Sequence, residues 1–432
     1  MPVNIPETGQ KRLVVAGAGF AGLKLVRELA DSDFQIVLID RNNYHQFQPL
    51  FYQVATAGLE PSAISFPLRK VFQRRKNIFV RVAEIQQVDT DHRRILTDSG
   101  PLRYDYLVLA TGVRTSYFGM ENIRNYSIPM KTVAQALALR NRILSNFEMA
   151  VTMTDHQQLK ELLSVVVVGG GPTGVEVSGA LADLRNFVLP KDYPDLDFSL
   201  MEISIVEASD RLLGGMSEVA ARKSKAYLEK LGIRVYTGTR VVDYDGYRVS
   251  FHDGRTIGTH TLIWAAGITG SYPEGIKKEQ VVRGNRLMTD RYNRLQGTDH
   301  IFVIGDLAFM PTARYPGGHP QLAQVAIQQA RNLARNFRRM GKGHPLHPFE
   351  YTDKGSMATV GRNLAVVDLP FIRFGGRIAW LTWMFVHLMS IVGVKNRLLV
   401  FINWFWNYVT YDQSLRLIIK PFRKEDTRKA LF

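Results

Sequence analysis

Three glycines near the start of the sequence stand at a spacing that suits phosphate binding. Gly17, Gly19 and Gly22 lie in the segment GAGFAG, and Asp40 ends the next apolar run. The first glycine of such a motif allows a tight turn, the second lets the backbone approach a pyrophosphate, and the third lets a helix pack closely on a strand. An acid at the end of the next strand suits a ribose. We therefore predict a dinucleotide-binding unit, the alternative being a merely glycine-rich turn.

The same pattern occurs again farther along the chain. Gly169, Gly171 and Gly174 lie in GGGPTGVE, and Glu207 ends the following apolar run. This acid is farther from its glycines because the segment 185–199 is expected to be an inserted loop. Two such units imply two dinucleotides, or one unit that has become degenerate.

Two short turns of small residues follow apolar runs at matching places in the two copies. Thr111 and Gly112 end the first turn, and Ala266 and Gly267 end the second. Backbone amides in such turns can meet a cofactor at the carboxyl edge of a parallel sheet. Asp306 ends a further apolar run, 300–306.

The chain contains no cysteine. Disulfides, thiolate metal sites and redox-active thiol pairs are therefore excluded, and any electron transfer must use a bound cofactor. The histidines are dispersed without metal-ligand spacing, so we predict no metal. His45, which lies alone, is expected to be structural.

Apolar runs predict the strands that must position these residues. The runs 13–16 and 35–39 frame the first glycine loop, and 163–168 and 202–207 frame the second. The pattern predicts further strands at 78–82, 84–89, 94–97, 104–112, 233–242, 247–251, 261–267 and 300–306, and helices at 132–158, at 217–231 and from Gln321 onward. The expected fold class is α/β, with two Rossmann-like dinucleotide-binding domains.

The protein is basic, with 55 Lys and Arg against 39 Asp and Glu. Such a charge favours anionic partners, which leaves nucleic acid and an anionic membrane surface as candidates. In the segment 371–432 the basic residues alternate with apolar surface rather than with a base-reading module. We therefore predict a membrane surface and no nucleic acid. The amino end lacks the pattern of a signal peptide, so we expect synthesis and folding in the cytoplasm.

Two apolar segments near the carboxyl end, 378–394 and 396–411, carry most of the tryptophans. In the second segment a polar stripe is formed by Asn396, Asn403, Asn407 and Thr410. The apolar residues that face away from it are Leu399, Ile402, Phe405, Trp406 and Val409. These two segments have three interpretations: the core of a small extra domain, an interfacial membrane anchor, or a helix that spans the membrane. Flanking Trp, Lys and Arg favour the interfacial amphipathic anchor.

Taken together, these segments resemble a type II NADH dehydrogenase, the single-subunit, non-proton-pumping NADH:quinone oxidoreductase. The resemblance covers nearly the whole chain and rests on GAGFAG, FQPLFYQVAT, ATG, GGGPTGVE, IGD, AQVAIQ and NRLLVFINWFW. The glycine loops occur across two-dinucleotide flavoproteins, whereas the FQPL segment, the A-Q-x-A-x-Q helix and the tail are more specific.

The resemblance implies a glutathione-reductase-like fold that binds FAD and NADH. The implied parts are an FAD-binding domain at 1–125 and 286–370, an NADH-binding domain at 126–285, and C-terminal membrane-associating helices at 371–432. The residues implied to bind FAD are Gly17, Gly19, Phe20, Ala21, Gly22, Asp40, Arg41, Thr111, Gly112, Asp306 and Gln324. Those implied to bind NADH are Gly169, Gly171, Gly174, Glu176, Glu207, Ala266 and Gly267. A carboxylate at 207 repels a 2′-phosphate and favours NADH over NADPH, although Arg211 nearby weakens this preference.

The implied reaction is hydride transfer from NADH to FAD, followed by two-electron reduction of a quinone. Glu176 is implied to lie near the nicotinamide and the flavin; the alternative is a surface acid stabilised by the helix dipole. Gln324 and Gln328, one turn apart, are implied to line a quinone tunnel; the alternative is a solvated helix face. The helix that starts near Gln321 is expected to stabilise reduced flavin through its positive end.

The implied partners are NADH, a membrane quinone (ubiquinone or menaquinone) and an anionic membrane surface, with a homodimer left open. The implied location is the cytoplasmic face of the cell inner membrane, as a peripheral, monotopic protein. Pro49, Leu50 and Gln53 are implied to shape the surroundings of the flavin and quinone, or only to pack on the sheet.

Other functions remain as alternatives. They are a soluble FAD-dependent NAD(P)H reductase of a protein such as ferredoxin, an apoptosis-inducing-factor-like protein, and a non-enzymatic flavin-binding membrane protein. The absence of cysteine excludes a disulfide reductase and argues against a sulfide:quinone oxidoreductase.

Overall fold

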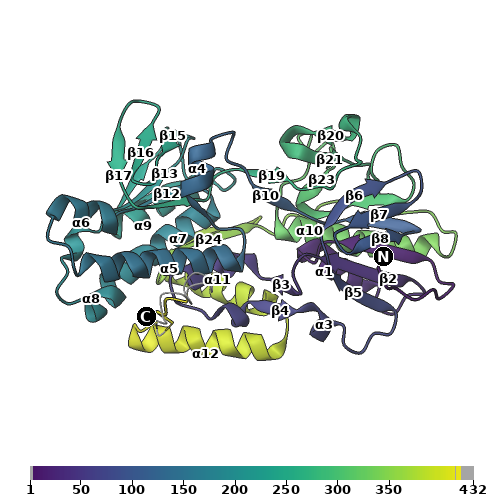
Figure 1. Cartoon of the computed structure of the whole chain (residues 1–432), viewed down its shortest axis with the longest axis horizontal. Coiled ribbons are helices and arrows are strands. Elements are labelled where there is room, and N and C mark those ends of the chain that lie inside the picture. The colour runs from purple at the N-terminus through teal and green to yellow at the C-terminus, as the bar shows by residue number, and fades with distance from the viewer. Residues whose placement is uncertain (1–2, 414, 420–432) are drawn as a thin grey trace, which may run out of the picture. The chain divides into compact units, whose positions relative to one another are not determined.

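The computed structural model describes residues 3–413 and 415–419 and divides into two compact units. Unit 1 contains Met1–Gln46, Ser65–Thr115 and Ile268–Lys354. Unit 2 contains Phe47–Ile64, Ser116–Gly267 and Gly355–Phe432. Figure 1 labels their helices and strands. Each unit thus gathers segments that are distant in sequence.

Unit 1 is built on a five-stranded parallel sheet in the order β22-β9-β1-β2-β5. The strands are β1 (Arg12–Ala16), β2 (Gln35–Asp40), β5 (Ile78–Val82), β9 (Tyr106–Leu109) and β22 (Ile301–Val303). The fully buried side chains of β1 explain its continuous apolar run, because a parallel sheet is covered on both faces. Helices α1 (Phe20–Glu28) and α10 (Ala323–Met340) pack against each other.

Smaller elements complete unit 1. They are β3 (Tyr44–Gln46) paired with β4 (Ser65–Pro67), helix α3 (Leu68–Val71), the sheet of β6 (Ile85–Asp89), β7 (Arg94–Thr97) and β8 (Gly100–Arg103), the sheet of β20 (Val281–Val282), β21 (Arg286–Met288) and β23 (Ala308–Phe309), and the pair β10 (Val113–Thr115) and β19 (Ile268–Gly270).

Unit 2 repeats the same architecture around the parallel sheet β11-β18-β12-β13-β14. Its strands are β11 (Ile128–Pro129), β12 (Val165–Val168), β13 (Ile203–Val206), β14 (Ile233–Tyr236) and β18 (Thr261–Trp264). Two antiparallel sheets accompany it: β15 (Val241–Tyr244), β16 (Arg248–Phe251) and β17 (Thr256–Gly258), and β24 (Ser356–Gly361), β25 (Leu364–Asp368) and β26 (Arg373–Gly375). The predicted pair of Rossmann-like units is therefore confirmed.

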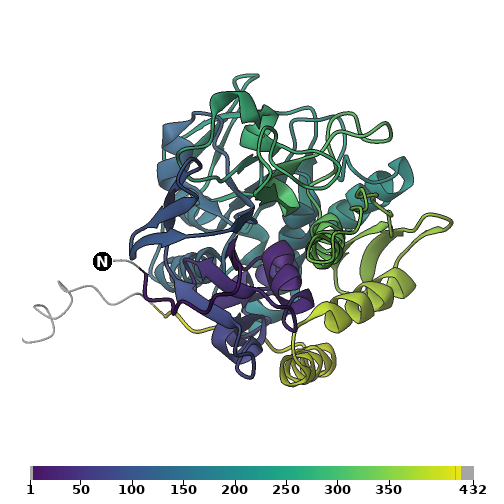
Figure 2. The same ribbon diagram turned by 90° about the vertical axis from the view of Figure 1, so that its right-hand side faces the viewer.

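The α-helices described in unit 2 are α2 (Phe51–Ala55), α4 (Glu121–Tyr126), α5 (Val133–Ala150), α6 (His156–Leu163), α7 (Pro172–Asp183), α8 (Leu189–Asp192), α9 (Glu218–Lys230), α11 (Arg377–Ser390) and α12 (Val394–Thr410). The last two lie near the carboxyl end of the described residues. Figures 1 and 2 both show α11 and α12 side by side, in agreement with their contacts. Among the described residues, no helix has both the length and the apolar character needed to cross a membrane.

Helix α12 packs on the rest of unit 2 through its polar stripe. The Asn396 side chain donates to the backbone carbonyl of Ser62 at 2.9 Å, and the Asn407 side chain donates to that of Gly58 at 3.1 Å. Trp404, on the same side, is buried. The apolar residues Phe405 and Val409 are 61% exposed. The asparagines therefore satisfy carbonyls of the protein, and the apolar face points outward.

The structure corrects four predicted elements, whereas others, such as the strands predicted at 104–112 and 300–306, differ from it only by a few residues at their ends. The predicted helix 132–158 is two helices, because the chain leaves α5 after Ala150 and Asp155 caps α6 by accepting from the Gln158 amide. The predicted strand 233–242 is interrupted at Gly238, where φ is 63°, and forms β14 and part of β15.

The other two corrections concern helices. The expected loop 185–199 begins as a π-helical continuation of α7 (Leu184–Val188) followed by α8, since Leu184, Val188 and Leu189 are buried. The helix expected from Gln321 begins at Ala323. The Gln321 side chain instead donates to the Asp306 carbonyl at 3.0 Å.

We predict that Gly179→Ala destabilises the protein, although alanine is the better helix former by about 1 kcal/mol. Helix α7 crosses β24 at Gly179, where an added Cβ would lie 2.0 Å from the Val360 carbonyl oxygen. Forced overpacking of this kind costs about 1–3 kcal/mol. Urea unfolding measures the change. Gly214→Ala is the control, because its Cβ would meet nothing within 4 Å. Equal or higher stability of Gly179→Ala would contradict the close crossing.

Candidate functional site

The first glycine loop of unit 1 forms a tight turn with an open outer side. Gly17 has φ +99°, and an added Cβ would lie 2.4 Å from the Ala110 carbonyl oxygen. A Cβ on Gly22 would lie 1.9 Å from the Gly17 carbonyl oxygen, whereas a Cβ on Gly19 would meet nothing within 4 Å. The sequence therefore folds as the spacing predicts, and open space remains at Gly19.

Asp40 ties the end of β2 back to this loop. Its carboxylate accepts from the Ala18 amide at 2.7 Å and from the Asn42 amide at 2.7 Å. The His45 ring nitrogen Nδ1 lies 2.8 Å from the Ala18 carbonyl, and burial lowers the pKa of His45. A neutral His45 donating to that carbonyl fixes the loop, which agrees with its expected structural role.

The second glycine loop in unit 2 reproduces this arrangement. Gly169 has φ +111°, and a Cβ on Gly174 would lie 1.8 Å from the Gly169 carbonyl oxygen, whereas Gly171 faces open space. The Glu207 carboxylate accepts from the Gly170 amide at 2.6 Å and from the Ser209 amide at 2.8 Å. The acid after the second strand thus fixes the glycine loop in both units.

The two loops fit the pyrophosphate of a dinucleotide. Gly19 and Gly171 are the N-cap residues of α1 and α7, and neither helix has a side-chain cap hydrogen bond. Amides at a helix N-terminus carry partial positive charge and bind phosphate. The open space at both glycines lets a phosphate approach these amides. Each unit can therefore hold one dinucleotide, as expected for FAD and NADH.

The remaining predicted cofactor residues lie near the ends of the same sheets or on the first helix. Thr111 donates from its hydroxyl to the Ser271 carbonyl, and Gly112 and Gly267 have φ +68° and +74°. Asp306 lies in a 3-10 turn directly after β22. The others are Phe20 and Ala21 on α1, Arg41 after β2, and Ala266 after β18. These positions are compatible with the predicted contacts to the cofactors, which stay predictions.

Gln324 and Gln328 lie in the first turns of α10, in unit 1. The Gln328 side chain donates to the Thr352 carbonyl at 2.8 Å and accepts from the Thr352 amide at 3.0 Å. Gln324 accepts from the Lys354 amide at 3.1 Å. Both side chains therefore hold the segment 352–354, and their place in a quinone tunnel stays a prediction.

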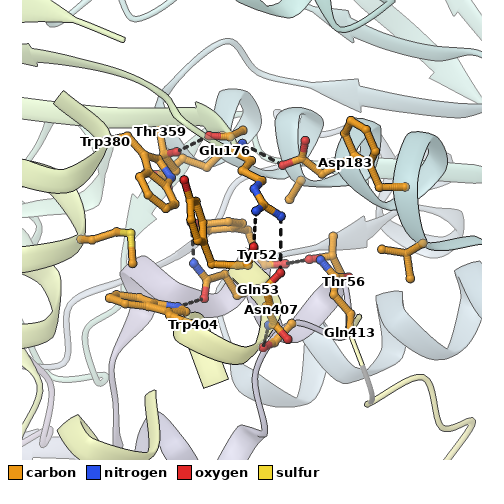
Figure 3. Close-up of a pocket in the computed structure, with 18 of the residues that line it drawn as sticks. Tyr52, Gln53, Thr56, Glu176, Asp183, Thr359, Trp380, Trp404, Asn407 and Gln413 are labelled. Atoms are coloured by element: carbon orange, nitrogen blue, oxygen red, sulfur yellow. Dashed lines mark hydrogen bonds between the residues drawn. The ribbon is translucent and has the colours of Figure 1, made fainter. Parts of the chain in front are cut away.

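A pocket of about 850 Å³, including its open mouth, lies entirely within unit 2. Helix α2, helix α7, the end of β24 and helices α11 and α12 form its walls (Figure 3). Its aromatic lining consists of Tyr52, Phe187, Trp380, Trp383, Trp404, Tyr408 and Tyr411. Such a pocket suits a flat, mostly apolar ligand with a few polar atoms.

Glu176 is the most strongly perturbed acid in this pocket. It is 7% exposed, and burial raises its pKa to about 8, an effect that the Thr359 backbone and the Trp383 side chain only partly offset. The carboxyl is therefore protonated near neutral pH and can donate a hydrogen bond or a proton. Its burial rules out the alternative of a solvated surface acid.

A short hydrogen-bond chain lies across the pocket from α12 to α2. The Trp404 indole donates to the Gln53 side-chain oxygen at 2.7 Å, and the Gln53 amide group donates to the Tyr52 hydroxyl at 2.8 Å (Figure 3). Burial raises the pKa of Tyr52 well above its usual value, so the hydroxyl stays neutral. Gln53 thus lines the pocket, whereas Leu50 packs in the core, and their implied role around the flavin and quinone stays a prediction.

Sequence reasoning missed Asp183 and Arg362, which also line the pocket. Asp183 follows Glu176 by two helical turns and accepts from the Arg362 amide at 2.9 Å, while burial raises its pKa to about 6. The Arg362 guanidinium lies over the rings of Tyr408 and Tyr411. The spacing from Glu176 to Asp183 was the only signal in the sequence, since β24 is distant from α7 along the chain.

Comparison with known families agrees with this architecture. The model of pyridine nucleotide-disulphide oxidoreductases matches residues 11–330, which covers both glycine loops. The model of the NDH2 C-terminal domain matches residues 354–410, which includes α11 and α12. The class is thus that of the two-dinucleotide flavoproteins, although this chain has no cysteine for disulfide chemistry.

Relatives define the family more narrowly. The type II NADH:quinone oxidoreductase NdhA of Mycobacterium tuberculosis is 35% identical over 92% of this chain and 87% of its own length. A type II NADH:quinone oxidoreductase of Staphylococcus aureus is 31% identical over 82% of this chain and 88% of its own. The chain belongs to the type II NADH:quinone oxidoreductase family.

Solved structures share the fold. NDH2 from Plasmodium falciparum in complex with NADH has a TM-score of 0.87 at 23% identity, covering 95% of this chain and 100% of that one. The sulfide:quinone oxidoreductase of Aquifex aeolicus has a TM-score of 0.69 at 19% identity, covering 95% and 96%.

We predict that Glu176 makes the stability of the protein fall as pH rises. Its pKa increases from 4.5 to about 8 on folding. The folded state therefore binds the proton more tightly, and this stabilisation is present below the unfolded pKa and is lost as pH rises through the folded pKa. Relative to Glu176→Gln, the wild type should lose about 1.4 kcal/mol per pH unit between roughly pH 5 and 8.

Urea unfolding of both proteins across this pH range measures the difference. Glu229→Gln is the matched control, because this α9 side chain is 51% exposed and its replacement should leave the wild-type slope. Parallel pH profiles for wild type and Glu176→Gln would contradict the buried, protonated state of Glu176.

Proposed function

We propose that this FAD-dependent enzyme uses the described sites to oxidise NADH and reduce a quinone, without proton pumping. When bound, FAD supplies the two-electron carrier between NADH and the quinone. The residues of the chain bind the two dinucleotides, orient their reacting ends, exclude water and hold a proton. The buried, protonated Glu176 in an aromatic pocket is the observation on which the quinone step depends.

Unit 1 holds FAD and unit 2 holds NADH in this proposal. The loop at Gly19 and the N-terminus of α1 receive the FAD pyrophosphate, and the loop at Gly171 and the N-terminus of α7 receive that of NADH. The boundaries 1–125 and 286–370 for the FAD-binding domain, 126–285 for the NADH-binding domain and 371–432 for the membrane-associating helices stay part of this proposal. They differ from the two units in the segments 47–64, 116–125, 268–285 and 355–370. Glu207 lies where the adenosine ribose binds, and its negative charge disfavours the 2′-phosphate of NADPH.

The quinone headgroup occupies the pocket of unit 2 in this proposal. Aromatic rings stack on a flat ring, and Gln53 can exchange its partners for a quinone carbonyl oxygen. Glu176, protonated near neutral pH, supplies a proton to a reduced quinone oxygen. Gln324 and Gln328 are kept as candidates for the lining of an access tunnel.

We predict that Gln53→Ala raises the KM for a short-chain quinone about tenfold, since two hydrogen bonds in the pocket are lost. Stopped-flow absorbance of the holoenzyme separates the two half-reactions. The flavin band should bleach with NADH at the wild-type rate, and its recovery with quinone should slow. Gln157→Ala, at an exposed position on α6, is the control.

Two outcomes would contradict different parts of this proposal. A wild-type flavin that never bleaches with NADH would overturn the enzymatic function. Normal bleaching together with unchanged quinone recovery in Gln53→Ala would overturn only the assignment of the pocket.

The exposed apolar face of α11 and α12 is proposed to rest on a membrane surface. We call it the outer face, and its exposed residues are Ile378, Leu381, Phe385, Met389, Leu398, Phe401, Ile402, Phe405, Trp406 and Val409. Contiguous apolar surface of this kind marks an interaction site, and a helix in the interface buries such a face among lipids. The basic chain favours anionic lipid, as on the cytoplasmic face of an inner membrane.

We predict that Phe401→Ser combined with Phe405→Ser lowers vesicle affinity about a hundredfold, because each ring loses the free energy of burial in lipid. Co-sedimentation with phosphatidylglycerol vesicles measures binding, and flavin content reports folding. Tyr126→Ser combined with Tyr247→Ser removes two exposed rings elsewhere in unit 2 and is the control. Unchanged binding of the Phe401 and Phe405 variant would place the membrane surface elsewhere.

A further inference from the structure

A short aromatic arm, Ser116 to Phe118, lies along the carboxyl end of β18 in unit 2. The Ser116 amide donates to the Gly267 carbonyl at 3.2 Å, and the Trp264 indole donates to the Ser116 carbonyl at 2.8 Å. The Tyr117 ring stacks on Trp264 with centroids 6.1 Å apart. The arm is therefore fastened to the last residue of β18 and to the small-residue turn that follows it.

Phe118, the last residue of the arm, combines three unusual properties. It has φ +52°, a conformation that costs energy for a residue with a side chain, and its ring is 68% exposed. The ring also fills the space beside Gly267, where an added Cβ would lie 2.5 Å from its Cζ atom. The ring also meets the edge of Trp264 with centroids 6.4 Å apart, yet most of it stays exposed, and backbone strain of this kind concentrates at ligand sites.

The order of strands indicates which part of a bound dinucleotide this ring meets. Glu207 at the end of β13 marks the side of the adenosine ribose, and the glycine loop after β12 marks the pyrophosphate. β18 lies on the other side of β12. A dinucleotide that extends from β13 across β12 therefore places its second half at the end of β18, beside Gly267 and Phe118.

We propose that Phe118 is a binding residue that covers the nicotinamide half of NADH and NAD⁺ at the Gly267 turn. This inference rests on the proposed assignment of NADH to unit 2. Gly267 supports this arrangement, because a side chain at this position would collide with the Phe118 ring. The ring packs against the nicotinamide and shields it from water.

Titration calorimetry of the holoenzyme with NAD⁺ and with ADP-ribose tests the proposal. ADP-ribose carries the adenosine and pyrophosphate but lacks the nicotinamide. Phe118→Ala should weaken NAD⁺ binding roughly tenfold, the effect of losing one aromatic contact, and leave ADP-ribose binding unchanged. Phe118→Tyr keeps the ring and should restore NAD⁺ affinity. Tyr247→Ala removes an exposed ring on the β16 side of unit 2 and is the control.

Each other outcome has a definite meaning. Equal losses for NAD⁺ and ADP-ribose in Phe118→Ala would show a structural role and overturn the proposal, as would unchanged NAD⁺ affinity. Phe118→Gly provides a second check, because it relieves the positive φ and should fold at least as stably as the wild type. Its NAD⁺ affinity should still fall. Failure of the wild type to bind either ligand would instead overturn the assignment of NADH to unit 2.

Discussion

The docking of α12 through its polar stripe is the interaction on which the site and its surroundings depend. Asn396 and Asn407 satisfy backbone carbonyls of the segment 58–63, and Trp404 reaches Gln53 on α2. This contact closes one wall of the pocket. It also determines which face of the helix points outward, since the side that carries Asn396 and Asn407 is bound to the protein. The same hydrogen bonds thus form the proposed quinone site and direct an apolar surface outward.

The burial of Glu176 is the second constraint, and it depends on the packing of α12, which closes the pocket around this acid. Glu176 lies on α7, the helix that begins at the second glycine loop, and the aromatic walls of the pocket remove it from water. The close crossing of α7 and β24 at Gly179 brings Thr359 to the carboxyl. One helix therefore carries the proposed phosphate-binding amino end and, little more than a turn later, an acid that can hold a proton.

Much of the fold could be predicted because the signals are local in sequence. The glycine spacing and the acids Asp40 and Glu207 determine turns, strands and helix starts within short segments. The pocket could not be predicted, because α2, α7, β24 and α12 meet only in three dimensions. An amphipathic pattern also does not say which face of α12 meets the protein. The break in the predicted helix near 151–155 and the break in the predicted strand at Gly238 were missed, because the Asp155 cap and the positive φ of Gly238 were not recognised as ends of these elements.

Labelling with a photoreactive quinone analogue tests the central claim that the pocket of unit 2 holds the quinone headgroup. The holoenzyme is illuminated with the analogue, digested and mapped by mass spectrometry, with and without excess unlabelled quinone. We expect displaceable labels on Tyr52, Met384 or Trp404, which come from three different walls of the pocket. Displaceable labels confined to α10, around Gln324 and Gln328, would contradict it and favour a site on that helix instead.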